Sequence, residues 1–152
     1  MLLYRIAEEQ FARDLSGEGA RLYGGRWNPK GIPMLYTAES VALAALEVLV
    51  RLSTPKRYSR IVYGAPDDAS LEIMTVQSLP PQWLIPYPNP SLMEIGGRWA
   101  QERRSLLLKV PSAVVRGEGW NILINPLHPE FSSVGIVDVA PFTYDDRLLD
   151  KR

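Results

Sequence analysis

The chain has 152 residues, 46% hydrophobic and 22% charged, which is the balance of one globular domain. Lysines plus arginines equal aspartates plus glutamates at 17 each, so no net charge favours direct binding of nucleic acid or anionic lipid. With no cysteine and one histidine, His128, disulfides, thiolate metal sites and a cysteine nucleophile are excluded, and a histidine metal cluster or Ser-His-Asp triad is disfavoured.

The chain starts with a segment that does not read as an export signal. Residues 1–11 carry acidic groups where a signal peptide would continue its apolar core, and no apolar run approaches the length of a membrane span. We therefore expect a cytoplasmic protein that makes no membrane contact. Its chemistry is expected to use Arg, Glu, Ser, Tyr, Asn or Asp, without a metal.

The expected elements mix strands and helices without a repeating unit. An acidic helix or loop should follow the first strand, a proline-rich crossing loop should span residues 79–90, and a charged, frayed tail should end the chain at residues 144–152. Helices are expected at residues 40–52 and 91–105, the second weakened by Gly96-Gly97. This order predicts one α+β (mixed α/β) domain over residues 1–152. Strands are expected at residues 2–6, 34–37, 60–64, 71–76, 106–110, 121–124 and 135–139.

A glycine-rich segment, residues 19–31, follows the first strand. Its glycines allow close backbone approach to a ligand, and Arg21 and Arg26 offer planar donor groups suited to phosphate or carboxylate. The segment predicts an anion-binding loop, with a surface turn carrying solvated arginines as the alternative. GGRW recurs at Gly96 with different flanks, and we infer no internal repeat from it.

The helix expected at residues 40–52 has Ser40 as its N-cap and is apolar nearly all round, which predicts packing on several sides. Its one carboxylate, Glu47, is costly in such surroundings unless it is paired or faces a polar cleft. The alternative is an ordinary helix-surface pair with Arg51, four residues further on.

Two polar residues follow apolar strands in the C-terminal half. Ser112 ends the run at residues 106–110, and Asn125 ends the run at residues 121–124. Polar groups at strand ends often line a pocket beside a sheet, although each is also a common turn residue. His128, between two prolines, is expected in a loop.

Four segments in order match a known family. They are GARLYGGRWNPKG from residue 19, MLYTAES with ALEVLV, LLKVPSAVV, and NILINPLHPEF. Together they reach across almost the whole chain. The chain resembles the RES domain, a family named for an arginine, a glutamate and a serine, which supplies the toxins of bacterial RES-Xre toxin-antitoxin systems.

The resemblance implies a fold similar to that of ADP-ribosyltransferases and an enzyme that cleaves NAD between nicotinamide and ribose. Its motifs imply a catalytic set of Arg26, Glu47 and Ser112. Arg26, with Arg21, would clamp the pyrophosphate, Glu47 would contact the ribose, and Ser112 would bond the carboxamide or ribose. The implied NAD-binding set is Arg21, Arg26, Tyr36, Ser112 and Asn125.

The residues are compatible with this chemistry. Ordinary glycosidases need two carboxyls because the leaving oxygen must be protonated. Nicotinamide in NAD is already a cationic leaving group, so one carboxylate suffices, and Glu47 is the candidate. NAD is then the substrate and no cofactor is required, with water or inorganic phosphate as the acceptor.

Two other functions remain open from the sequence. One is mono-ADP-ribosylation of a protein by the same residues, and the other is a non-catalytic binding domain. The resemblance also implies growth arrest by the toxin, an Xre-type antitoxin that blocks the active site, and assembly as a homodimer or a toxin-antitoxin hetero-oligomer.

Overall fold

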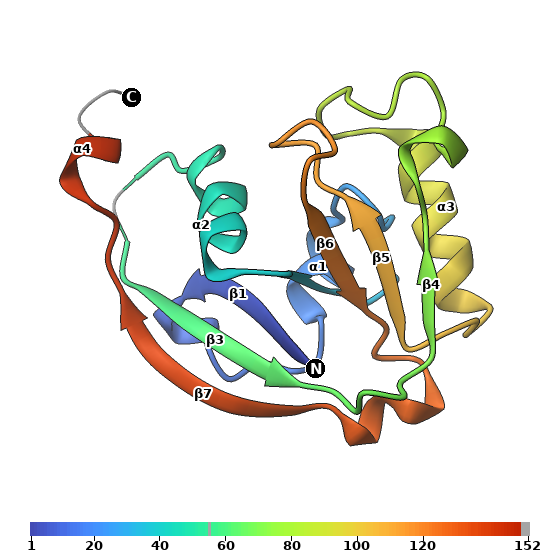
Figure 1. The fold of residues 1–152 in the computed structure, drawn as a ribbon, viewed down its shortest axis with the longest axis horizontal. Helices are drawn as coiled ribbons and strands as arrows, with labels where there is room; N and C mark the ends of the chain where they lie inside the picture. The colour runs from blue at the N-terminus through green and yellow to red at the C-terminus, as the bar shows by residue number, and fades with distance from the viewer. Residues whose placement is uncertain (55, 150–152) are drawn as a thin grey trace.

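The computed structural model describes residues 1–54 and 56–149. Its centre is one mixed seven-stranded sheet with the order β4-β5-β6-β2-β1-β3-β7 (Figure 1). Neighbouring strands are antiparallel except for β4 and β5, which run parallel. The strands are β1 (Leu2–Glu8), β2 (Leu35–Ala38), β3 (Tyr58–Gly64), β4 (Leu71–Ile73), β5 (Leu107–Pro111), β6 (Trp120–Ile124) and β7 (Gly135–Phe142).

The expected α+β domain is confirmed, and the expected strands all occur with shifted ends. β7 is longer than expected, whereas β4 is shorter, because the chain turns into the 3-10 helix η2 (Val76–Ser78). The helices are α1 (Glu18–Tyr23), α2 (Val41–Leu49), α3 (Pro90–Gln101) and α4 (Asp146–Leu149), with further 3-10 turns η1 (Glu9–Phe11) and η3 (Pro129–Ser133). Among the described residues, no helix is both long and apolar enough to cross a membrane.

Two short helices differ from the sequence expectations. α1 occupies the start of the segment expected to be a glycine loop, so Arg21 lies on a helix. α4 lies within the tail expected to be frayed. The rest of that tail, residues 150–152, lies outside the described residues.

α2 begins as expected and is less buried than expected. The Ser40 side chain accepts a hydrogen bond from the Leu43 backbone N–H, which confirms the N-cap. The helix lies beside β1 (Figure 1) and buries Leu43 and Ala44 against the sheet. Leu46 is 38% exposed, so the predicted packing on several sides does not extend to this residue. Besides the sheet, Val115 packs on the same cluster and the Tyr144 hydroxyl donates to the Ala45 carbonyl of α2.

α3 packs against the glycine segment through its two glycines. A Cβ atom on Gly96 would lie 1.9 Å from the carbonyl oxygen of Trp27, and one on Gly97 would lie 2.8 Å from the Pro29 ring. The backbone of the glycine segment therefore lies directly on α3. These glycines set the distance between helix and loop, and Trp27 and Trp99 share one core cluster beneath them.

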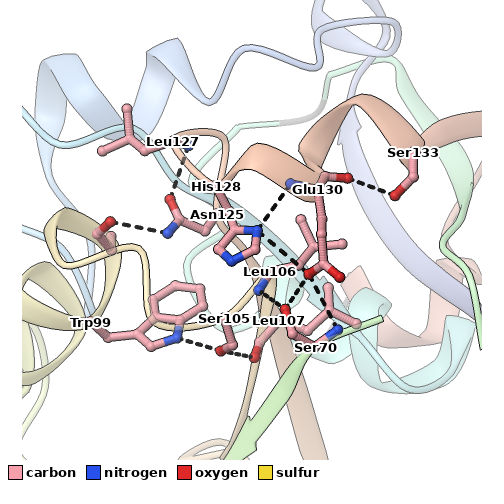
Figure 2. Close-up of polar contacts among 11 residues, drawn as sticks. Ser70, Trp99, Ser105, Leu106, Leu107, Asn125, Leu127, His128, Glu130 and Ser133 are labelled. Carbon is pink, nitrogen blue, oxygen red and sulfur yellow. Dashed lines mark hydrogen bonds and ion pairs between the residues drawn. The ribbon is translucent and has the colours of Figure 1, made fainter. Parts of the chain in front are cut away.

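A polar network at the C-terminal end of β6 joins α3, η3 and the neighbouring strand ends (Figure 2). Asn125 Nδ2 donates to the Ala100 carbonyl at 3.0 Å, and its Oδ1 accepts from Leu127 N–H at 3.0 Å. Ser70 Oγ donates to Glu130 and accepts from Leu106 N–H. His128 lies in the loop before η3, as expected, where its Nδ1 accepts from Glu130 N–H.

Substituting Gly96 with alanine tests the contact between α3 and the loop. The added Cβ would overlap a backbone oxygen that cannot move independently, and we expect a net loss of about 2 kcal/mol or more in the free energy of unfolding. Gly19→Ala is the matched control, because a Cβ there meets nothing within 4 Å and alanine favours α1 by about 0.5–1 kcal/mol. Urea unfolding that shows equal effects for both variants would contradict this packing.

Candidate active site

The alternation of strand side chains brings the central polar residues to one face of the sheet. Asn121 on β6 is opposite Ala38 on β2 and Val110 on β5. Since every second residue of a strand faces the same side, Tyr36 and Ser112 share that face with Asn121. α2 covers one end of this face, and α3 together with the glycine segment packed on it covers the other end. The candidate site lies where these two layers meet.

Glu47 of α2 is bonded to the sheet at this place. Its Oε1 accepts a hydrogen bond from Ser112 Oγ at 2.7 Å and a second from Asn121 Nδ2 at 2.7 Å. Ser112 is fully buried, and Glu47 is half-buried. Two of the predicted catalytic residues, 65 positions apart in the chain, are thus in direct contact.

The alternative reading of Glu47 as the partner of Arg51 is wrong. The described residues contain no Glu47-Arg51 ion pair, because the helix ends at Leu49 and the chain then tightens into turns. The carboxylate is bonded to the sheet instead. The geometry therefore fits the reading in which Glu47 faces a polar site.

Arg26 faces the same region from the loop. Its Nη1 donates to the backbone carbonyls of Trp83 and Ile85, both at 3.1 Å, which anchors the guanidinium to the proline loop (residues 79–89). Burial lowers the pKa of Arg26, and the nearby negative charge of Glu47 opposes that shift. Arg26 and Glu47 nevertheless form no ion pair in the described part of the chain. The two opposite charges are near each other but not in contact.

Tyr36 links the loop to the sheet through its hydroxyl. The O–H donates to Asn28 Oδ1 at 2.6 Å, and the oxygen accepts from Trp27 N–H at 3.0 Å. Burial raises the pKa of the Tyr36 phenol, so it stays protonated and keeps both bonds. Its position next to Trp27 means that Tyr36 also helps to hold Arg26.

The structure does not bring Arg21 and Asn125 into this cluster. The Arg21 guanidinium donates from Nε to Glu18 Oε2 at 2.7 Å and from Nη2 to Glu18 Oε1, a pair within α1. Asn125 is fully buried at the opposite end of β6 from Asn121, and both ends of its amide are used in the network of Figure 2. Both residues have structural partners that account for them.

Asn121 is the member of the cluster that sequence reasoning missed. A strand was predicted at residues 121–124, and in the observed strand the Asn121 side chain lies on the same face of the sheet as Leu123. The available signal was a polar residue at a strand position whose neighbour two residues further on, Leu123, is buried and apolar.

The described residues also contain a groove of about 780 Å³ away from this cluster. It is lined by residues of η1, β3, β7 and α4, and includes none of the predicted site residues. The candidate site is placed at Glu47 because this carboxylate is held by two side-chain donors and lies near Arg26.

Comparison with known proteins places the chain beside a single family. Residues 2–145 match the RES domain model. The chain is 37% identical to "Toxin Res" of Photorhabdus laumondii over 98% of this chain and 97% of that protein, and 39% identical to the "Prs ADP-ribosylating toxin" of Sphingobium sp. over 92% and 89%. The fold is similar to a chain in the crystal structure of the M. tuberculosis MbcT-MbcA toxin-antitoxin complex, with a TM-score of 0.74, 24% identity, and coverage of 93% of this chain and 84% of that one.

Replacing Tyr36 with phenylalanine tests its role in holding the loop. The ring stays, but Asn28 Oδ1 and Trp27 N–H lose their partner in a buried place, so we expect a loss of about 2 kcal/mol or more in unfolding free energy. Tyr87→Phe is the control, because Tyr87 is exposed and the Tyr23 carbonyl that it bonds can turn to water. Comparable losses in both variants, measured by urea unfolding, would count against the loop-holding role.

Proposed function

The chain belongs to the RES domain family of toxins, and we propose that it arrests growth by cleaving NAD between nicotinamide and ribose. The observation that carries the proposal is the arrangement of one carboxylate opposite one arginine. Glu47 is held by two donors, and Arg26 is held by two carbonyls. Each group is preorganised, and neither is neutralised by the other.

This separation suits a dinucleotide with charge at both places. The Arg26 guanidinium still has N–H groups beyond Nη1 that can bond the pyrophosphate of NAD in a planar, bidentate way. The carboxylate of Glu47 suits the ribose next to the positively charged nicotinamide. Ser112 and Tyr36 lie on the sheet face between the two layers and complete the proposed contacts to the substrate.

The proposed reaction needs neither a metal nor a general acid. The bond between nicotinamide N1 and ribose C1′ breaks, and its electron pair goes to the ring nitrogen, which leaves as neutral nicotinamide. Glu47 stabilises the positive charge that develops on the ribose. An acceptor oxygen then bonds C1′ and gives up its proton to solvent, so the products are nicotinamide, a proton and ADP-ribose, or phosphorylated ADP-ribose if phosphate is the acceptor.

A protein acceptor is the second candidate function. One relative of this chain is named an ADP-ribosylating toxin, and transfer of ADP-ribose to a protein would use the same bond cleavage. The two candidates differ in where the ADP-ribose is found and share their dependence on Glu47.

Purified protein incubated with NAD, with and without phosphate and with a cell extract, tests both candidates. We expect nicotinamide release by the wild type and a loss of about 100-fold or more in Glu47→Gln, which keeps the size of the side chain but removes the charge. Mass spectrometry of small molecules and of proteins locates the ADP-ribose. Glu94→Gln is the control, since Glu94 lies on α3 in an exposed pair with Arg98. Intact NAD in the wild-type sample, or full activity in Glu47→Gln, would overturn the proposal.

We also propose that an antitoxin covers this site. A toxin that removes a central metabolite must be silenced in the cell that makes it, and a structural neighbour was solved as a toxin-antitoxin complex. Two exposed apolar side chains belong to residues near Arg26: Tyr23, three positions earlier in the chain, is 73% exposed, and Ile85, whose carbonyl Arg26 bonds, is 51% exposed. Such a patch beside a polar site is suited to a protein partner.

Co-expression with the product of the neighbouring gene tests this partner. We expect it to restore growth to cells that make the wild-type toxin, but not to cells that make Tyr23→Asp, because a buried charge weakens an interface by about tenfold or more. Val137→Asp is the control, since Val137 is 61% exposed on β7. A neighbour that leaves wild-type toxicity unchanged, or that neutralises all three proteins equally, would contradict the proposed interface.

A further inference from the structure

Asn121 has no role in the function proposed above, yet it is in direct contact with the central carboxylate. We infer that Asn121 is a positioning residue, which together with Ser112 fixes the orientation of Glu47 so that one chosen oxygen faces the substrate. The inference rests on the proposed function, because it assigns a task to Asn121 within that reaction.

The orientation of the Asn121 amide is set by Glu47. A carboxylate oxygen only accepts hydrogen bonds, so the amide must turn its N–H₂ group toward Glu47 Oε1, 2.7 Å away. This leaves Asn121 Oδ1 buried without a partner among the described residues. A buried acceptor without a donor is unfavourable. The Asn121 amide keeps this unfavourable orientation because the opposite one would remove its hydrogen bond to Glu47.

Both donors bond the same oxygen of Glu47. Ser112 Oγ comes from the end of β5 and Asn121 Nδ2 from β6, and each lies 2.7 Å from Oε1. In the described part of the chain, Oε2 accepts no hydrogen bond. Two donors on one oxygen prevent the carboxylate from rotating, since rotation would break both bonds at once. Oε2 is thereby kept available.

The free oxygen is the one that can act on the substrate. A carboxylate stabilises a developing positive charge best when it does not have to reorganise in the transition state. Asn121 contributes by holding Glu47 and is not expected to bind NAD. Its loss should therefore lower the rate of the chemical step and leave the affinity for the substrate nearly unchanged.

The test is the steady-state kinetics of nicotinamide release by Asn121→Ala and Asn121→Leu, leucine having nearly the shape of asparagine but no donor. We expect kcat to fall about tenfold or more, with KM within about twofold of the wild-type value. Thermal unfolding is followed in parallel. Ser105→Ala is the control, because the Ser105 hydroxyl bonds Trp99 Nε1 in the buried network of Figure 2, and its loss should lower Tm without lowering kcat.

Wild-type kcat in both Asn121 variants overturns the inference, as does a fall in kcat only where the fold is lost. A wild-type protein that releases no nicotinamide overturns the proposed function instead. The task assigned to Asn121 within that reaction is then overturned with it. With an active wild type, only the Asn121 variants decide the inference, so the two failures are distinguishable.

Discussion

The buried side chain of Asn28 is the constraint on which the glycine loop depends. Its Oδ1 accepts from the Tyr36 hydroxyl, and its Nδ2 donates to carbonyls on both sides of the turn at 2.8–3.1 Å, those of Ala20, Pro29 and Ile32. Asn28 is fully buried, so these bonds replace water and add to the single backbone bridge between Gly25 and Asn28. The Asn28 amide thereby fixes the turn that carries Arg26, whose guanidinium is in addition bonded to the Trp83 and Ile85 carbonyls.

The two halves of the site are held by different means on one rigid support. Arg26 belongs to the glycine segment and is hydrogen-bonded to the proline loop. Glu47 is hydrogen-bonded to side chains at the ends of β5 and β6. The hydrogen-bonded pair of β2 and β6 joins them, because Tyr36 and Asn121 are side chains of these adjacent strands. Groups that are held by strands keep their separation better than groups on mobile loops. A fixed gap between opposite charges is the result.

The local sequence predicted the elements better than their partners. Ser40 followed by an apolar run was sufficient to locate α2, because an N-cap is a local interaction. Gly96 and Gly97 suggested a weak helix, but their reason is the Trp27 loop, which lies about 70 residues away in the chain and cannot be read from spacing. Arg21 and Arg26 looked equivalent for the same reason, since Glu18 as partner for the first depends on α1 forming. Ser112 and Glu47 were expected together from the family resemblance, whereas Asn121 required the register of β6.

Unsatisfied polar groups show where this fold departs from the requirements of stability alone. Two buried side-chain polar atoms lack a partner among the described residues, Trp27 Nε1 and Asn121 Oδ1. Trp27 follows Arg26, and Asn121 holds Glu47, so both atoms belong to residues next to the two charges. Each costs about 1–3 kcal/mol in a dry interior. Proteins break such local rules mainly where function requires it. The two exceptions therefore lie at the candidate site that contains Arg26 and Glu47, and they were identified from hydrogen bonding alone.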